Sequence, residues 1–585
     1  MKLKKLLIPF FKSIPKLLLF QLVSSFLVQL CAWGISELSN LILGTAGKTS
    51  VSSGDFAFVF THWQGYAVIA LMIVIVLLYV AADVNALIIY CGELIDGREP
   101  RIFKCLWKGL LALKKYLDPR GAVVIIYLTL ISPIIGLGFS ISLTKNFYIP
   151  KFISSVIYGN PLMTVGMYVL FGFFFLVGIV YCFILHGTLL DGKRMKEASV
   201  ESRRLIKSNW KNFLFEMFRF LMIMLAFYLL IAVVFLVVPQ LVFRLIPGGK
   251  ESLSLLRIIL LMIGAAMLLI LNMLGSSFIV IKIDLLRRRY KSSGEWEYKP
   301  APKKRHPAVI AGAALLLCVV LVMSLLLWFS YENNILIFEN KVGITAHRAG
   351  GTEAPENTVK GIETAASLGA SGAEIDIQRT SDGYYVVNHD DSFKRVAGVD
   401  QKPSELTLEE VRRLRVDGEP VPTLEETLEA SRDRLRLFVE LKGETADSKM
   451  ADDAVRIIKE AGMEKQTVLI SLKYDVLEYI ERKYPEIETG YLAFFSFGKM
   501  EKMPFDYFAL EEEIATSEAI DNIRSRGKKV MVWTVNDEED IEEFLQSNAD
   551  MIITDEVSLS LKLKKELGSR KPEELLIEYI RKLFI

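Results

Sequence analysis

The chain has 585 residues and a formal net charge of only +2, but its charge and hydropathy change sharply near residue 330. Lys and Arg outnumber Asp and Glu by 35 to 15 in residues 1–330, whereas Asp and Glu outnumber Lys and Arg by 52 to 34 in residues 331–585. The first half is also rich in long apolar runs, and basic loops beside membrane spans are expected to face anionic lipid, so its positive charge does not indicate nucleic-acid binding. The acidic second half argues against a groove that binds a polyanion. The contrast predicts two domains of different class.

Long apolar runs fill the first half and predict a membrane domain over residues 1–335. Runs of about 20 or more apolar residues recur between short polar segments, which is the pattern of transmembrane helices. We expect about seven spans, at residues 16–40, 65–90, 121–143, 162–188, 215–243, 258–281 and 308–330. The lipid bilayer is therefore the expected partner of this half.

Basic residues in alternate loops predict how these spans are oriented. Lys and Arg crowd the N-terminus and the loops after the second, fourth and sixth spans, whereas the other three loops carry few of them. Because Lys and Arg are retained in cytoplasmic loops, the N-terminus is expected inside the cell. Seven crossings then place the second half outside the cytoplasm, and an eighth span would reverse that side.

Short apolar strands alternate with amphipathic helical segments in the second half. The strands are expected at residues 342–346, 373–379, 435–441, 467–472, 488–494, 505–510, 529–535 and 550–554. The helices are expected at residues 357–369, 446–461, 474–483, 516–526 and 537–547. This pattern predicts an α/β fold, a (β/α)8 TIM barrel over residues 340–568, with a doubly wound open sheet as the alternative. Both folds place chemistry at the carboxyl ends of the strands.

An amphipathic segment follows the predicted barrel at residues 569–585. Its apolar residues recur at helical spacing, so it suits either a membrane surface or the side of the barrel. We favour packing against the barrel.

Three carboxylates at predicted strand ends suggest a metal site. Glu374 and Asp376 are two residues apart on one strand, so their side chains project to the same face. Two carboxylates that point into a barrel repel each other unless a cation lies between them, and their oxygens suit Ca²⁺ or Mg²⁺. Glu440 offers a third carboxylate from another strand, and Lys442 shares its face. Surface alternation on an edge strand would also produce either pair alone.

The second half contains only two histidines, and each ends a strand-like run. A single histidine is more often structural, but His347 and His389 beside a carboxylate cluster suggest an acid and base pair, because imidazole titrates near neutral pH. Arg348 could clamp an anion, and Gly350 with Gly351 allows close backbone approach. Such a pocket suits a phosphate ester. No P-loop or dinucleotide fingerprint is visible, which disfavours phosphoryl transfer from a nucleotide.

Five sequence blocks, in this order, resemble the glycerophosphodiester phosphodiesterase family: "HRAGGTEAPENT", "GAEIDIQRTSDGYYVVNHD", "VPTLEETL", "FVELKG" and "VWTVN". The resemblance covers about residues 342–560, and the whole chain looks like the bacterial members with an N-terminal multi-span membrane domain. One departure is the alanine that follows Arg348, where many members have His-Arg-Gly. The extra residue alters the loop but leaves His347 and Arg348 in place.

The resemblance implies a role for each matching residue. These roles are metal ligation by Glu374, Asp376 and Glu440, general acid and base chemistry by His347 and His389, and phosphate binding by Arg348 and Lys442. Glu356 would support the first-strand loop or the metal, and Trp533 would either pack against the glycerol or belong to the core. Members of the family are thought to use the substrate's own neighbouring glycerol hydroxyl as nucleophile, and the products are glycerol phosphate and an alcohol.

These features together predict a membrane-anchored, metal-dependent phosphodiesterase that hydrolyses glycerophosphodiesters outside the cytoplasm. The anchor suggests lipid-borne substrates, such as phospholipid head groups or a polyglycerophosphate polymer, although nothing in the sequence separates these from soluble diesters. Two alternatives are a protein that binds or senses a lipid head group and a lipid transporter with an accessory barrel. The intact histidines and carboxylates argue against the sensing protein.

Overall fold

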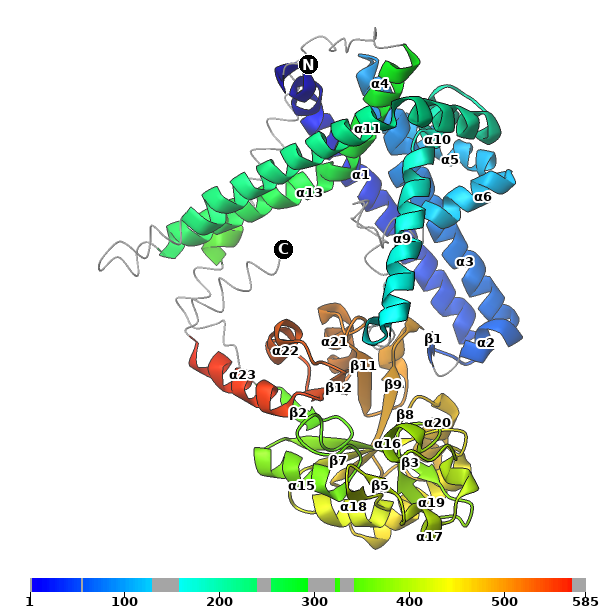
Figure 1. The fold of residues 1–585 in the computed structure, drawn as a ribbon, viewed down its shortest axis with the longest axis vertical. Helices are drawn as coiled ribbons and strands as arrows, with labels where there is room; N and C mark the ends of the chain where they lie inside the picture. The colour runs from blue at the N-terminus through cyan, green and yellow to red at the C-terminus, as the bar shows by residue number, and fades with distance from the viewer. Residues whose placement is uncertain are drawn as a thin grey trace.

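The computed structural model describes residues 3–53, 56–128, 157–238, 254–292, 321–326 and 341–570. A helical half precedes a barrel surrounded by helices, and the two meet near β1 (Ser50–Ser52) in Figure 1. The main helices of the first half are α1 (Leu3–Gly44), α2 (Phe56–Thr61), α3 (Trp63–Tyr79), α4 (Leu87–Ile95), α5 (Ile102–Leu111), α6 (Pro119–Ile126), α9 (Pro161–Tyr181), α10 (Ile184–Leu190), α11 (Met195–Ala232) and α13 (Ser254–Lys291).

Five helical stretches within the described residues are long and apolar enough to cross a membrane. They are Ile14–Gly44, Trp63–Ile95, Pro161–Leu190, Met195–Phe235 and Ile258–Lys291. They coincide with the predicted first, second, fourth, fifth and sixth spans. The predicted third and seventh spans lie mostly outside the described residues, so the total of seven stays a prediction.

Helix α11 differs from the sequence prediction, because it also includes the basic segment that the prediction assigns to a loop. No proline or glycine interrupts its 38 residues, so nothing in the local sequence stops the helix. At 1.5 Å per residue such a helix is ~57 Å long, well beyond the ~30 Å hydrocarbon core of a bilayer. The basic first half of α11 therefore has room to lie outside the membrane.

Buried charges in the helical half are paired between helices. Glu216 on α11 accepts hydrogen bonds from Lys282 on α13 at 2.8 Å and from Arg219 at 2.9 Å. Arg287 on α13 is also buried, and it contacts both Asp284 and Asp191. An unpaired charge would be costly in this setting, so these contacts hold the helices α11 and α13 and the end of α10 together.

Eight parallel strands close into a barrel in the second half. They are β2 (Gly343–Ala346), β3 (Gly372–Arg379), β7 (Arg436–Leu441), β8 (Thr467–Ser471), β9 (Thr489–Ala493), β11 (Tyr507–Glu511), β12 (Lys529–Trp533) and β13 (Met551–Thr554). Strand β2 pairs with both β13 and β3, which closes the sheet. The predicted (β/α)8 barrel is confirmed, and the closure excludes the doubly wound open sheet. A short strand, β4 (Tyr385–Val387), runs antiparallel to β3 beside it.

The helices of the barrel are α15 (Val359–Leu368), α16 (Lys394–Ala397), α17 (Leu408–Val411), α18 (Leu424–Ser431), α19 (Ser448–Glu460), α20 (Tyr474–Lys483), α21 (Ser517–Arg524), α22 (Glu538–Leu545) and α23 (Val557–Ser569). The five predicted helices correspond to α15, α19, α20, α21 and α22. Of the predicted amphipathic tail, residues 571–585 lie outside the described residues.

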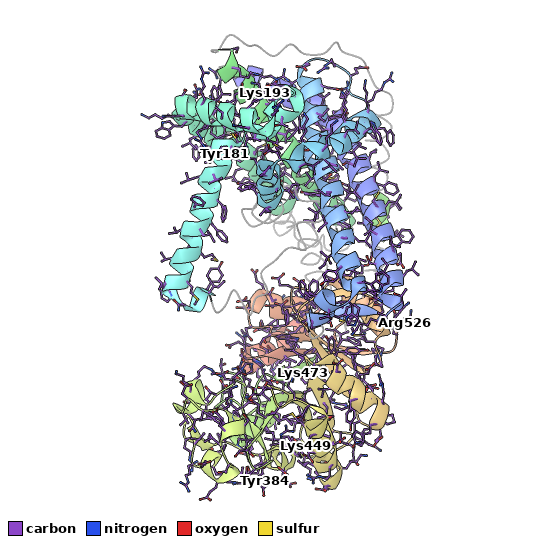
Figure 2. All side chains as sticks on the ribbon, turned by 90° about the vertical axis from the view of Figure 1, so that its right-hand side faces the viewer. Tyr181, Lys193, Tyr384, Lys449, Lys473 and Arg526 are labelled. Carbon is purple, nitrogen blue, oxygen red and sulfur yellow. The ribbon has the colours of Figure 1, made fainter. Side chains whose placement is uncertain are left out.

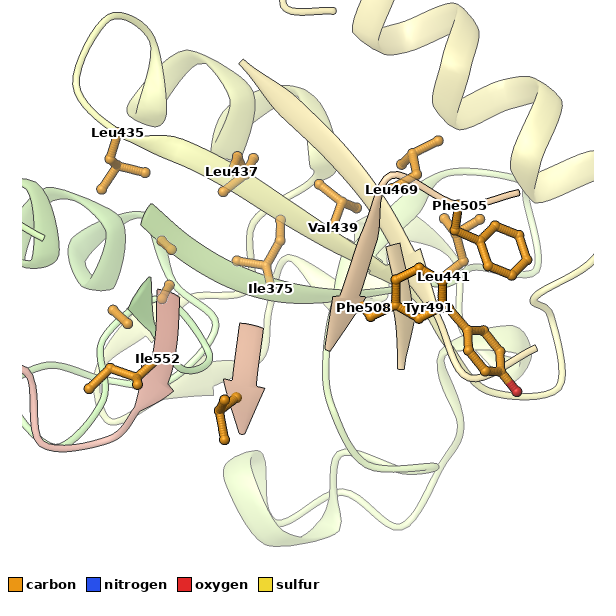
Figure 3. Close-up of a cluster of buried hydrophobic side chains, with 14 of the residues drawn as sticks. Ile375, Leu435, Leu437, Val439, Leu441, Leu469, Tyr491, Phe505, Phe508 and Ile552 are labelled. Atoms are coloured by element: carbon orange, nitrogen blue, oxygen red, sulfur yellow. The ribbon is translucent and has the colours of Figure 1, made fainter. Parts of the chain in front are cut away.

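The main core of the barrel lies between the strands and the surrounding helices (Figure 3). On β3, Ile375 and Ile377 point outward into this core, whereas Glu374 and Asp376 alternate with them and point inward. A second, smaller apolar cluster fills the interior below them and includes Phe438 on β7. The alternation therefore buries two carboxylates above an apolar floor, at one end of the barrel.

Candidate active site

The three predicted metal ligands converge at the carboxyl end of the barrel. One carboxylate oxygen from each of Glu374, Asp376 and Glu440 lies within 4.8 Å of the other two. Asp376 on β3 and Glu440 on β7 are direct partners in the strand register, which explains their closeness. All three side chains are buried. They lie close enough to share one cation.

Lys442 is the neighbouring positive charge. Its Nζ donates to Asp376 Oδ1 at 2.9 Å and to Glu440 Oε2 at 3.2 Å. Burial opposes ionisation of Asp376, but the charge of Lys442, with help from His389 and Asn357, still lowers the pKa of Asp376. Burial raises the pKa of Glu440 to about 7, and burial with the two neighbouring carboxylates raises the pKa of Glu374 well above its usual range.

The charges of the three carboxylates and of Lys442 show whether this cluster fits a divalent cation. Three buried carboxylates carry more negative charge than one lysine offsets, so the cluster resists full ionisation by itself. Oxygen donors at this spacing are the ligand type that Ca²⁺ and Mg²⁺ prefer. The donor set therefore fits the predicted divalent cation.

His347 directly follows β2 and is held by Asp555, which directly follows β13. Its Nδ1 lies 2.7 Å from Asp555 Oδ1. Asn536 fixes Asp555 in turn, because its Nδ2 donates to Asp555 Oδ2 at 2.7 Å. Burial opposes ionisation of Asp555, yet the contact with His347 lowers its pKa. With Nδ1 engaged, the imidazole has Nε2 left for a substrate.

His389, which follows β4, has a matching arrangement. Its Nδ1 lies 2.8 Å from Asp390 Oδ1, and Arg395 donates from Nε to Asp390 Oδ2 at 2.7 Å. These contacts outweigh burial and lower the pKa of Asp390 to about 2. Burial, aided by the charges of Lys442 and Arg348, lowers the pKa of His389. Both histidines thus have a carboxylate that orients the ring.

Glu356 connects Arg348 to Arg395. Arg348 donates from Nη1 to Glu356 Oε1 at 3.3 Å, and Arg395 donates to both Glu356 oxygens at 2.7 Å. The backbone N–H of Arg348 also donates to Glu374 Oε2 at 2.9 Å. Of the two roles expected for Glu356, these contacts support the one in which it holds the first-strand loop.

The loop after β2 contains residues with positive φ and packs closely against the backbone of nearby segments. Ala349, the residue that departs from the family pattern, has a φ of 66° and is fully buried. Gly351 has a φ of 55°, and a Cβ there would lie 2.3 Å from the backbone oxygen of Asp555. A Cβ on Gly350 would lie 2.6 Å from the oxygen of Ala354. A side chain at either position would therefore collide with the backbone, whereas the close approach of this loop to an anion stays a prediction.

Trp533 ends β12 and packs against the apolar interior of the barrel. Its Nε1 donates to the backbone oxygen of Ala509 at 2.9 Å, and it is the register partner of Glu511. The ring thus belongs in part to the core, and its contact with glycerol stays a prediction.

Sequence reasoning missed four residues that hold the site in place: Asn357, Asp390, Arg395 and Asp555. Asn357 donates from Nδ2 to Asp376 Oδ2 at 2.9 Å. Two of the four had a usable signal, since Asp390 follows His389 directly and Asp555 follows a predicted strand. No local pattern pointed to Arg395, because its partners are 5 and 39 residues away.

A closed barrel with ionisable groups gathered at its carboxyl end, joined to apolar helices, defines a membrane-bound TIM-barrel enzyme. Residues 3–325 match the family described as the membrane domain of glycerophosphoryl diester phosphodiesterase, and residues 347–559 match the glycerophosphoryl diester phosphodiesterase family. The chain therefore belongs to the glycerophosphodiester phosphodiesterases that carry a membrane domain.

Relatives of the barrel carry the same activity in their names. A glycerophosphodiester phosphodiesterase of Caldanaerobacter subterraneus is 29% identical over 247 residues, which are 39% of this chain and all of the relative. Another, from Bacillus altitudinis, is 25% identical over 241 residues, covering 38% of this chain and 98% of the relative. A phosphodiesterase structure from Oleispira antarctica, in complex with the product sn-glycerol-3-phosphate, is 24% identical with a TM-score of 0.36 and covers 39% of this chain and 97% of that one.

We predict that Gly351→Ala distorts the site, because the new Cβ would collide with the backbone at Asp555. The control is Gly527→Ala, which also has a positive φ but would meet nothing within 4 Å. The control should lose only the ~1–2 kcal/mol cost of a left-handed alanine and keep its activity. Gly351→Ala should lower both the thermal midpoint and kcat/KM of the full chain by more than the control. Equal effects in the two variants would contradict the close-approach argument.

Arg395 offers a second test. It lies outside the carboxylate cluster, but it holds Asp390 and Glu356, which in turn contact His389 and Arg348. Arg395→Ala should lower kcat/KM by about 10–100-fold, as is typical for residues that orient a site from behind. Arg395→Lys should restore little, since lysine lacks the planar fork that binds Glu356 at both oxygens. The neighbouring Lys394→Ala, which removes only an exposed pair with Asp400, is the control and should stay near wild type. A full rescue by lysine would refute the fork requirement.

Proposed function

We propose that the barrel hydrolyses glycerophosphodiesters to glycerol phosphate and an alcohol by metal-dependent acid and base catalysis. The observation that carries the proposal is the pair of aspartate-held histidines, His347 and His389, beside a buried carboxylate cluster. Acid and base groups on either flank of an anion-binding pocket suit a reaction in which one proton leaves the nucleophile and another reaches the leaving group.

Glu374, Asp376 and Glu440 would hold the divalent cation. When bound, that ion offsets negative charge on the phosphoryl oxygens and so favours the transition state. Arg348 and Lys442 add positive charge next to these carboxylates. Lys442 is already oriented by Asp376 and Glu440, two of the expected metal ligands. The Asp376–Lys442 and Arg348–Glu356 contacts keep these groups positioned before a substrate arrives.

The two histidines would divide the proton transfers between them. One accepts the proton of the substrate's neighbouring glycerol hydroxyl as that oxygen attacks phosphorus, and the other donates a proton to the departing alcohol. Asp555 and Asp390 orient the rings through Nδ1, so that Nε2 of each performs the transfer. This attack forms a cyclic phosphodiester of glycerol. Water then opens the ring with the histidine roles exchanged: the former acid takes a proton from the water, and the former base returns a proton to the glycerol oxygen.

We further propose that the barrel lies outside the cytoplasm. Figure 2 shows Lys193, from the basic segment after α10, at the end of the helical half that lies away from the barrel. Since basic segments favour the cytoplasmic side, this placement supports a barrel on the opposite side.

The assignment of the histidines can be tested with a leaving group that needs no proton. His347→Ala and His389→Ala should each lower hydrolysis of glycerophosphoethanolamine by about 10²–10⁴-fold. With glycerol p-nitrophenyl phosphate, whose leaving group departs as the anion, the acid variant should recover most of its rate and the base variant should not. Recovery of both or of neither would contradict an acid and base pair.

Removal of the metal is a separate prediction. Chelation with EDTA, or Glu374→Gln, should abolish most hydrolysis, and only the chelated wild type should recover when Ca²⁺ or Mg²⁺ is added back. The control is Glu444→Gln, which changes an exposed carboxylate two residues beyond Lys442 and should leave the rate nearly unchanged. Full activity in EDTA would refute metal dependence.

The side of the barrel is tested with a membrane-impermeant thiol reagent on a variant that lacks native cysteines. Cysteine at the exposed Glu444 should react in intact cells, whereas cysteine at the exposed Lys196 in α11 should react only after permeabilisation. The reverse pattern would place the barrel inside.

A further inference from the structure

The loop between α1 and α3 adds a strand to the barrel half. Its residues Ser50–Ser52 form β1, which pairs antiparallel with β10 (Ser496–Gly498). The pairing extends beyond both ends of the strands, because Ser53 N donates to Phe495 O at 3.1 Å and Lys499 N donates to Thr49 O at 2.9 Å. The two halves of the chain are thus joined by backbone hydrogen bonds.

Side chains reinforce this junction. Phe497 of β10 packs against an apolar cluster of the membrane half that contains Leu43, Val51, Phe58 and Val68. Lys499 forms an ion pair of 2.8 Å with Glu37 on α1. Lys48 lies 5.0 Å from the ring centre of Tyr474 on α20, and Ser52 Oγ hydrogen-bonds to the hydroxyl of Tyr491 on β9. An apolar centre with polar contacts around it is how a specific interface is built.

The barrel segment in this junction belongs to the catalytic rim. β10 begins three residues after Ala493, the carboxyl end of β9. His347 follows the last residue of β2, and Glu440 is the last residue but one of β7. Glu374 and Asp376 lie at the same level on the longer strand β3, because Glu374 accepts a hydrogen bond from the backbone of Arg348 and Asp376 is the register partner of Glu440. Parallel strands of a barrel end at the same rim. The membrane half therefore binds the loop that contains β10, at the rim of the barrel where the candidate active site lies.

The loop that supplies β1 also lies at the edge of the membrane. One candidate span ends at Gly44 and the next begins at Trp63. Phe60, Trp63 and Tyr66 are more than half exposed, and aromatic rings of this kind gather at the membrane–water interface. Ser50 is six residues from Gly44, a reach of at most ~20 Å at ~3.3 Å per residue.

From this geometry we infer that the α1–α3 loop holds the catalytic rim at the level of the lipid head groups, so that the enzyme takes its diester from the bilayer. The inference rests on the proposed function and specifies its substrate class. That class is a membrane lipid whose head group is a glycerol phosphodiester with free neighbouring hydroxyls. The junction contributes by presenting the site to the bilayer and leaves the chemistry unchanged.

The test compares one head group in two physical forms. Full-length protein in vesicles that contain phosphatidylglycerol is assayed for glycerol phosphate release from that lipid and for hydrolysis of added glycerophosphoglycerol, its deacylated soluble counterpart. Rates are normalised to the fraction of barrels that protease reaches from outside. Phe497→Asp breaks the junction from the barrel side and Val51→Asp breaks it from the membrane side. Tyr384→Asp, an exposed aromatic at the end of the barrel far from the membrane half, is the control (Figure 2).

Both junction variants should lose at least about tenfold in rate on phosphatidylglycerol and stay within about twofold on glycerophosphoglycerol, and the unchanged soluble rate shows that the barrel is folded. Ser52→Cys with Ser496→Cys, which are register partners, should form a disulfide that restores the lipid rate to Phe497→Asp. A parallel fall on both substrates, or no fall on the lipid, would overturn the inference. Hydrolysis of neither substrate by wild type would instead refute the proposed function.

Discussion

The burial of three carboxylates around a single lysine is the constraint on which the rest of the site depends. On β3, Glu374 and Asp376 alternate with isoleucines that pack into the outer core, so these two acids point into the barrel. On β7, Glu440 lies between Val439 and Leu441, which also pack into the outer core, and it therefore points inward as well. Buried charge of one sign is costly unless it is offset. Lys442 offsets part of this charge, and a divalent cation, as proposed above, would offset the rest.

The fold was largely readable from the sequence because each strand and each span carries its own periodic signal. The eight strands alternate or run apolar over four to eight residues, which locates them but does not separate a closed barrel from an open sheet. That choice depends on the pairing of β2 with both β13 and β3, which are distant in the sequence. Helix α11 shows a limit of these signals. Its basic first half was predicted as a loop from charge composition, but the segment contains no proline or glycine and the helix continues through it. Composition reports where a segment lies relative to the membrane, and helix propensity decides what shape it takes there.

The site was predictable only where a residue carries its own chemistry. Histidines and paired carboxylates at strand ends point to function by type and position. Asp555 and Arg395 act through their partners, and those partners come from distant parts of the chain. Aspartate and arginine are ordinary surface residues in a single sequence. Their contacts become visible only when the fold brings β13 beside β2 and Arg395 of α16 beside Glu356 in the loop after β2.

The β1–β10 pairing was invisible in the sequence for the same reason, yet it constrains the topology more tightly than charge does. β1 follows the first span, and strands that exchange backbone hydrogen bonds must lie on one side of the membrane. If the first candidate span crosses the membrane, an even number of crossings separates β1 from the barrel, and the proposed topology then has an odd number of spans before the barrel. Eight spans do not meet this condition, whereas seven do. Charge would then only have to decide which side that is, and the proposal above takes the barrel to lie outside because basic segments favour the cytoplasmic side.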